Sequence, residues 1–115
     1  IISGTIENRA GEPLADVGIE LLDLDGYFLS ETRSDADGAW RSFPLLTGSY
    51  FVATESDPSG YNRELYDNHL CLPASQCDEP AYVVTNGTPL QVDGAPIVGI
   101  DFRLDRGIVF RDGFE

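Results

Sequence analysis

Lysine and methionine are absent from this 115-residue sequence, and histidine, tryptophan and cysteine are rare. All seven basic residues are arginine, against 20 acidic residues, so the formal net charge is −13. Such an acidic chain repels nucleic acids and anionic membrane surfaces, and neither is an expected partner. No apolar run is long enough to cross a bilayer, and no signal-peptide pattern is present. Because residue 1 is not methionine, we expect a processed mature form or an excised piece of a longer chain.

The single histidine, His69, argues against an enzyme. A Ser-His-Asp triad would have to use this residue, and no Gly-x-Ser-x-Gly motif is present to position a nucleophile. Pairs of carboxylates are unavoidable among 20 acidic residues and carry no specificity. The sequence therefore predicts a non-catalytic protein with no cofactor, calcium excepted as discussed below.

The two cysteines, Cys71 and Cys77, lie in the stretch CLPASQC. This spacing does not suit a CxxC redox or zinc pair, and even with His69 the two thiols leave a tetrahedral zinc site one ligand short. We therefore predict a disulfide that closes a small loop and stabilises the fold by about 2 kcal/mol. A disulfide indicates an oxidising compartment, so we expect a secreted protein.

Short stretches rich in β-branched, leucine and aromatic residues are separated by clusters of Gly, Asp, Asn and Pro. This pattern predicts one all-β domain, a seven-stranded Greek-key-type sandwich. The expected strands lie in IISGTIE, VGIELLDL, YFLSETR, AWRSF, PLLTGSYFVATES, PLQV and IVGIDFRL. The segment 57–88 is less regular and too long for an ordinary loop, so we expect it to be either functional or an irregular insertion stapled locally by the disulfide.

Two parts of the sequence resemble the carboxypeptidase regulatory-like domain family. ISGTIENRAGEPLADVGIELLDLDG and SDADGAWRSFPLLTGSYFVAT carry the resemblance, which spans residues 2–54 and again 97–104. The motifs ELYDN, C…C and GIDFRLDRG are similar to those of a subgroup found as tandem repeats in secreted bacterial proteins. The resemblance implies a transthyretin-like, or prealbumin-like, β-sandwich that serves as a structural, spacing or binding module. A related family forms Lys–Asn isopeptide crosslinks, which a lysine-free chain cannot make.

The sequence divides into a sandwich, residues 1–106, and a strand-like tail, residues 107–115. The tail, GIVFRDGFE, stands where the next tandem unit would begin. Its apolar residues Ile108, Val109, Phe110 and Phe114 predict an extra strand. That strand could pair with its own sheet, beside ISGT or IDFRL, or it could extend the sheet of the next subunit head to tail. Repeated head-to-tail contacts would build a filament.

These observations predict a secreted, extracellular or cell-surface structural module that assembles with copies of itself or with neighbouring domains. The alternative is a carbohydrate-binding or spacer module of a larger secreted protein. For carbohydrate, the candidate contacts are Trp40, Tyr61, Tyr66 and Tyr82, because aromatic faces pack on sugar rings. The competing interpretation places Trp40 in the core and uses Tyr61 and Tyr66 to anchor the insertion.

Two acidic turns are candidates for calcium. They are DLDG, with Asp23 and Asp25, and SDADG, with Asp35 and Asp37. Carboxylates around a tight glycine turn suit Ca²⁺, although neither turn continues to the glutamate of an EF-hand loop. The simpler interpretation is that Asp and Gly form turns. The two turns lie at opposite ends of one expected strand, so they cannot share an ion.

Overall fold

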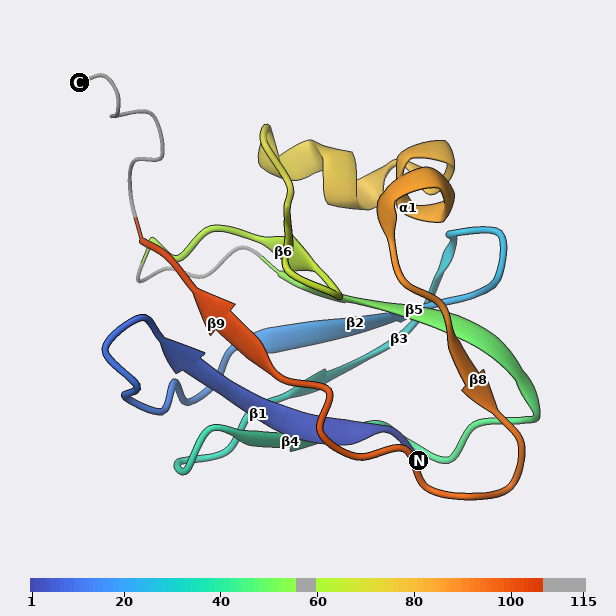
Figure 1. Cartoon of the computed structure of the whole chain (residues 1–115), viewed down its shortest axis with the longest axis horizontal. Coiled ribbons are helices and arrows are strands. Elements are labelled where there is room, and N and C mark those ends of the chain that lie inside the picture. The colour runs from blue at the N-terminus through green and yellow to red at the C-terminus, as the bar shows by residue number, and fades with distance from the viewer. Residues whose placement is uncertain (56–59, 107–115) are drawn as a thin grey trace.

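Two β-sheets pack face to face in the computed structural model, which describes residues 1–55 and 60–106 (Figure 1). The smaller sheet has the order β4-β1-β9 and comprises β1 (Ser3–Asn8), β4 (Ala39–Arg41) and β9 (Phe102–Leu104). β1 is antiparallel to β4 and parallel to β9. The predicted all-β sandwich is confirmed.

The larger sheet has the order β3-β2-β5-β6-β7, and β8 also pairs with β5. Its strands are β2 (Gly18–Leu22), β3 (Phe28–Arg33), β5 (Gly48–Thr54), β6 (Glu64–Leu65), β7 (His69–Leu70) and β8 (Leu90–Val92). The described residues therefore contain nine strands, where the sequence predicted seven, because β6 and β7 are two-residue strands within the segment expected to be irregular. The predicted extra strand, with Ile108, Val109, Phe110 and Phe114, lies outside the described residues.

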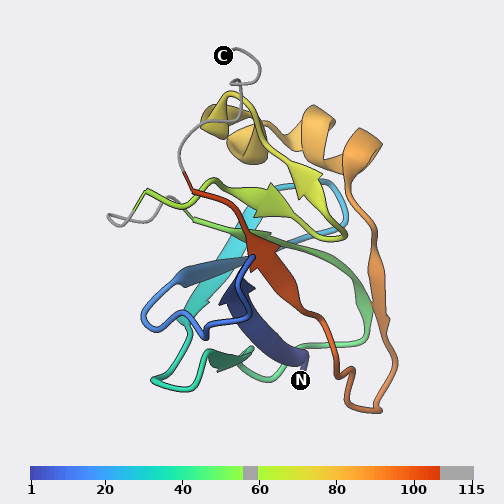
Figure 2. The same cartoon turned by 60° about the vertical axis from the view of Figure 1, so that its left-hand side comes forward.

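The predicted disulfide-stapled insertion is present, and its described part contains short regular elements that the sequence did not indicate. Besides β6 and β7, it contains the 3₁₀ helix η1 (Ala74–Asp78) and the helix α1 (Pro80–Asn86). These helices lie over the outer face of the larger sheet, on the side away from the smaller sheet (Figures 1 and 2). A proline at the first position of α1 suits a helix start, because its missing N–H has no partner there in any case. Within the described residues, no helix is long and apolar enough to span a bilayer.

Burial on both faces distinguishes β5 from an ordinary sandwich strand. Tyr50 and Val52 face the core between the sheets, whereas Phe51 and Ala53 lie in a second core beneath the insertion. The unbroken apolar run YFVA fits this position, because a strand covered on both sides needs no polar face. The insertion thus converts the outer face of the larger sheet into a second hydrophobic core.

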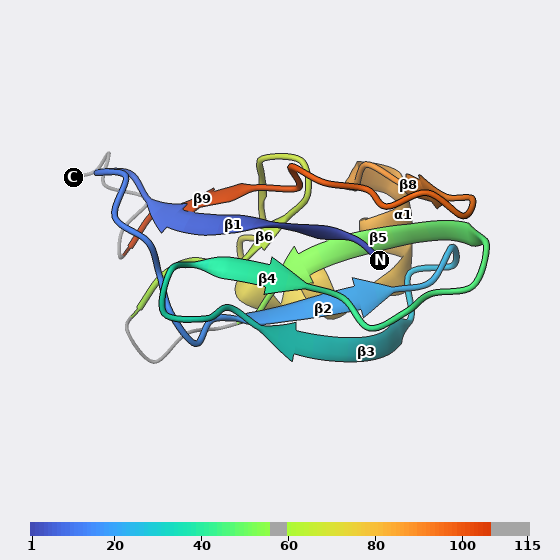
Figure 3. The ribbon, with the colours of Figure 1, turned by 90° about the horizontal axis from the view of Figure 1, so that it is seen from below.

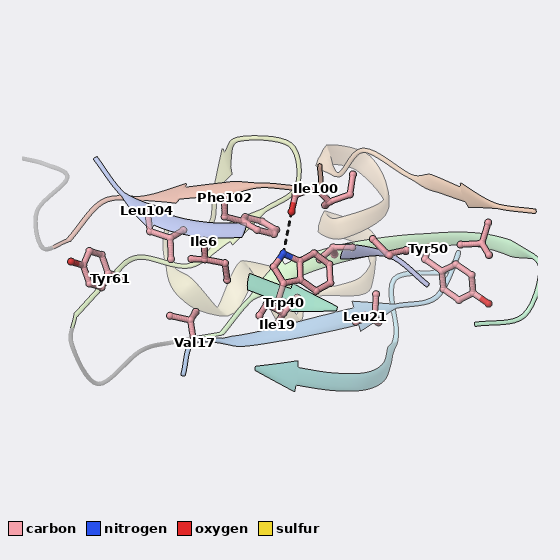
Figure 4. Packing of buried hydrophobic residues seen from close by; sticks show 13 residues of the cluster. Ile6, Val17, Ile19, Leu21, Trp40, Tyr50, Tyr61, Ile100, Phe102 and Leu104 are labelled. Atoms are coloured by element: carbon pink, nitrogen blue, oxygen red, sulfur yellow. Dashed lines mark hydrogen bonds between the residues drawn. The ribbon is translucent and has the colours of Figure 1, made fainter. Parts of the chain in front are cut away.

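The main core is organised around Trp40, which is only 3% exposed. Its indole Nε1 donates a hydrogen bond to the carbonyl oxygen of Ile100 at 3.1 Å, as Figure 4 shows. Gly4 lies opposite Trp40 in the β1–β4 pair, and a β-carbon placed on Gly4 would lie 1.8 Å from that same oxygen. The carbonyl therefore occupies the space that any side chain at position 4 would need.

Substitutions at these two positions should be strongly coupled. Gly4→Ala should lower the free energy of unfolding by about 1–3 kcal/mol, because the chain at Ile100 must move. Trp40→Phe should cost a similar amount by leaving the Ile100 carbonyl unpaired. In the double variant the costs should not add, since both act through one carbonyl, and urea unfolding of the four proteins measures this. As a control, the costs of Gly4→Ala and of Val83→Ala, which lies in the second core, should add in the double variant. Full additivity of Gly4→Ala with Trp40→Phe would contradict the shared role of the carbonyl.

Candidate functional site

A disulfide joins Cys71 to Cys77, as predicted, and both cysteines belong to the second core. The bond closes the short turn that carries η1 and so fixes the insertion internally. Both sulfur atoms are buried, so the pair stabilises a packed structure and offers no exposed thiol.

Arg63 connects the insertion to the sheet beneath it. The residue is 5% exposed, and its Nε donates to the carbonyl of Thr54 at 2.8 Å. Its Nη2 pairs with Glu20 at 3.2 Å and its Nη1 pairs with Asp78 at 3.0 Å. A guanidinium suits this position because its planar array of N–H donors can reach two strands and η1 at once. Losing it would leave Glu20 as an unpaired carboxylate in a largely buried site.

Two glutamates of the larger sheet lie away from solvent: Glu64 is buried and Glu20 is partly buried. Burial raises the pKa of Glu20 from 4.5 to about 7, in spite of the opposing charge of Arg63. Burial also raises the pKa of Glu64 from 4.5 to about 7, partly offset by Arg9. Glu64 is 4% exposed, and its Oε1 has no hydrogen-bond partner within residues 1–55 and 60–106. Both carboxyls therefore favour the protonated form below neutral pH.

The two acidic turns have the same hydrogen-bond pattern. The carboxylate of Asp23 accepts from the backbone N–H groups of Asp25 and Tyr27, each at 2.9 Å. Asp35 accepts in the same way from Asp37 and Ala39, again at 2.9 Å. The first aspartate of each turn thus holds the turn itself. The described part of the chain has no group of three or more His, Cys, Asp or Glu residues that could hold a metal, and calcium binding at these turns stays a prediction.

The structure does not bring the four candidate carbohydrate-binding aromatics onto one surface. Trp40 and Tyr61 belong to the main core, with 3% and 8% exposure, and offer almost no ring face to a sugar. Tyr66 is half-buried and packs edge-on against Phe102, with ring centroids 5.9 Å apart. Tyr82 lies on α1, where its hydroxyl is 2.5 Å from Nε2 of His69. The interpretation of Trp40 as a core residue is therefore correct, and sugar contact stays a prediction for Tyr66 and Tyr82.

A groove lies between the β2–β3 hairpin and the insertion. Its volume is about 480 Å³, and its walls include Leu22, Tyr27, Phe28 and Pro80. Glu20 and Asp78 also line it, so the groove is apolar with carboxylates beside it. Sequence reasoning missed this feature because Pro80 is more than 50 positions from the hairpin and the insertion was expected to be irregular.

A larger hollow, about 770 Å³ in volume, lies over the outer face of the smaller sheet. Short side chains of Ser3, Thr5 and Ala39 leave this space open, and Arg41 and Asp101 stand beside it. Asp101 already accepts hydrogen bonds from the backbone N–H and the hydroxyl of Thr5. The hollow thus combines a mainly apolar lining with a few charged side chains at its margin.

Charged residues gather just after the end of β9. Arg9 forms a bidentate pair with Asp105, with bonds of 2.9 and 3.1 Å. Arg106 donates to the hydroxyl of Tyr61 at 2.7 Å and stacks over its ring at 4.6 Å from the centroid. These contacts fix the chain as far as residue 106.

No protein-family model matches the chain, and no curated protein matches it. Among solved structures, it is similar to the Bacillus anthracis TIE protein, with 16% identity and a TM-score of 0.61 over 91% of this chain. It is also similar to BcpA*(D312A), the major pilin subunit of Bacillus cereus, with 15% identity and a TM-score of 0.60 over 92% of this chain. The chain spans only 17% and 28% of the length of these two proteins. At such identities the likeness shows a shared fold.

A third solved structure, Klebsiella pneumoniae 5-hydroxyisourate hydrolase, is 26% identical over 47% of this chain and 55% of its own. Its TM-score of 0.39 is too low to support a shared fold family.

The buried carboxyl of Glu64 predicts an unusual dependence of stability on pH. Because its pKa is higher in the folded state than in the unfolded chain, its contribution is fully present below about pH 4.5 and is lost as pH rises through about 7. Glu64→Gln should therefore raise the free energy of unfolding at pH 8, by up to about 3 kcal/mol, and have little effect at pH 4. Urea unfolding at both values measures the difference.

Glu79→Gln, at an exposed position, is the matched control, because it removes the same charge without a buried carboxyl. If Glu64→Gln and Glu79→Gln change stability equally at pH 8, burial of Glu64 is not the cause.

Proposed function

We propose that this chain is a non-catalytic structural module of an extracellular or cell-surface protein, and that it assembles with copies of itself through the 107–115 segment. The proposal rests on one observation: apolar, strand-forming residues follow the last described strand of the sandwich. Residues 1–55 and 60–106 by themselves supply two hydrophobic cores. Ile108, Val109, Phe110 and Phe114 then follow directly. Apolar strand residues that a domain does not need for its own core are suited to another chain.

Three further features support this function. One protein of similar fold is described as the major pilin subunit of Bacillus cereus. The disulfide favours an oxidising, extracellular location. The resemblance to the carboxypeptidase regulatory-like domains, which occur as structural and spacing modules, agrees with a chain that has no recognisable catalytic constellation in its sequence.

Charged substitutions in the 107–115 segment should prevent assembly. A full-length chain with Ile108→Asp and Phe110→Asp should remain folded and sediment as a 12.5 kDa monomer, because two buried carboxylates would oppose the contact. Light scattering and electron microscopy of the unmodified chain should show linear oligomers.

Val84→Asp, at an exposed apolar position on α1, is the matched control and should assemble normally. If the doubly substituted chain assembles as well as this control, the segment has no role in assembly. An unmodified chain that stays monomeric at high concentration would favour a spacer module.

Carbohydrate binding is the second candidate function, and the hollow over the smaller sheet, with charged side chains beside an open surface, favours it. Arg41, Asp35 and Asp101 supply both donors and acceptors around a space of about 770 Å³. Asp101→Asn and Arg41→Ala should each weaken binding on a glycan array at least tenfold, whereas Phe28→Lys, outside the hollow, should leave it unchanged. The absence of any glycan signal from the unmodified chain would exclude this candidate.

A further inference from the structure

We propose that the free edge of β3, together with the groove between the β2–β3 hairpin and the insertion, receives the 107–115 segment of a second copy of this chain. The inference rests on the proposed function and adds to it the surface that accepts the segment. We call this surface the acceptor edge and define it by Leu22, Tyr27, Phe28, Leu29 and Pro80.

The first observation is the exposure of apolar side chains at a sheet edge. β3 is the outermost strand of the larger sheet and pairs with β2 alone within the described residues. Tyr27, Phe28 and Leu29 at its start are 60%, 57% and 47% exposed. Sheet edges in soluble proteins are normally protected by charge, proline or a covering segment, because their backbone groups are free to pair. At Tyr27 to Leu29 the edge is both apolar and open.

The second observation is that a groove continues from this edge. Phe28 lies opposite Leu22 in the β2–β3 pair, so its side chain stands on the outer face of the sheet, where the groove begins. Leu22 forms part of the floor and Pro80 the far wall. A strand added beside β3 would therefore gain backbone hydrogen bonds from the edge and a pocket for alternate side chains.

The 107–115 segment has the chemistry that such a site selects. In an extended strand, Ile108 and Phe110 project from one face, because side chains alternate between faces. These two side chains suit the apolar walls of the groove. Arg111 projects from the opposite face of such a strand and so stays outside the groove, whose Glu20 and Asp78 are already paired with Arg63.

The positions of the two elements favour a contact between copies. The last described residue, Arg106, follows β9 and is joined to Tyr61 by a backbone bridge and by a hydrogen bond to the tyrosine hydroxyl. β9 is at the edge of the smaller sheet, and β3 is at the edge of the larger sheet on the opposite side of the sandwich, as seen in Figure 3. The β2–β3 hairpin, whose residues line the groove, lies at the other end of the molecule from the end of β9 (Figure 1). A fully extended nine-residue segment reaches at most about 30 Å, and it would have to wrap around the domain to reach its own groove.

A contact that joins different surfaces of identical subunits is heterologous. Each copy would offer one 107–115 segment at one end and one acceptor edge at the other. Unless the rotation between copies closes a ring, the contact repeats and produces a linear polymer. The inference therefore predicts head-to-tail order within any assembly.

Disulfide trapping between full-length chains tests the placement. One chain carries Phe28→Cys, and an isotopically heavy chain carries Phe110→Cys. After mixing under mild oxidation, mass spectrometry should find a mixed light–heavy dimer linked through the two new cysteines, in at least tenfold excess over the control. The control pairs Phe110→Cys with Leu46→Cys, which is 84% exposed and lies outside the acceptor edge. Equal yields from the two mixtures would overturn the proposal.

A second measurement separates failure of this inference from failure of the proposed function. Phe28→Lys in the full-length chain should weaken assembly at least tenfold in light scattering, whereas Leu46→Lys should leave it unchanged. Phe28 is largely exposed, so its substitution should not prevent folding, which circular dichroism verifies. If Ile108→Asp with Phe110→Asp abolishes assembly and Phe28→Lys does not, the segment assembles at another surface and the acceptor edge is wrong. If neither changes assembly, the proposed function fails as well.

Discussion

The carbonyl oxygen of Ile100 is the point through which the strands of the smaller sheet are tied to the main core. It accepts the indole N–H of Trp40, and it occupies the position that a β-carbon of Gly4 would take. The backbone around it is joined to β1 as well, because the N–H of Ile100 donates to the carbonyl of Ser3 at 3.0 Å. The Ile100 carbonyl thus fixes how closely the chain before β9 packs against β1. Because interiors tolerate neither an unpaired carbonyl nor an overlapping atom, glycine at position 4 and a donor at position 40 are required together.

The second organising feature is the insertion, which gives a small domain two cores in place of one. A 115-residue chain buries limited apolar surface, and covering both faces of β5 increases that amount without a third sheet. The insertion needs both the disulfide and Arg63, since η1 and α1 are too short to be stable by themselves. Covering this face also removes ionisable side chains from solvent, which is unfavourable for their charged forms. Glu20 is stabilised by its partner Arg63, while Glu64 has an unpaired oxygen within the described chain.

The sequence predicted the parts of the fold that local patterns determine. Val17, Ile19 and Leu21 alternate with other residues and do face the main core, because a half-buried strand requires that period. The Asp25-Gly26 pair correctly marked the β2–β3 hairpin. The short elements within residues 60–88 were not predicted because two-residue strands and helices of no more than two turns carry little periodic signal. The run YFVA did contain evidence of a second core, since a strand with one solvent-facing side would alternate.

The candidate site was less predictable than the fold for a related reason. The disulfide could be derived from cysteine spacing, because only two cysteines exist to pair. The groove beside Phe28 could not, because Pro80 meets the hairpin only after the insertion has folded over the larger sheet. The pairing of Arg63 with Glu20, 43 positions apart, likewise carries no local pattern.

Charge constrains how such modules can associate. Copies with a net charge of −13 repel one another over about one Debye length, roughly 8 Å at physiological ionic strength. Attraction must therefore come from short-range contacts that exclude water, and Tyr27, Phe28 and Leu29 provide an apolar surface for them at a sheet edge. Backbone hydrogen bonds between two paired strands would also fix their register, which apolar contact alone does not. In the proposed assembly, the acidic surface opposes random aggregation and the acceptor edge supplies the apolar contact that joins two copies.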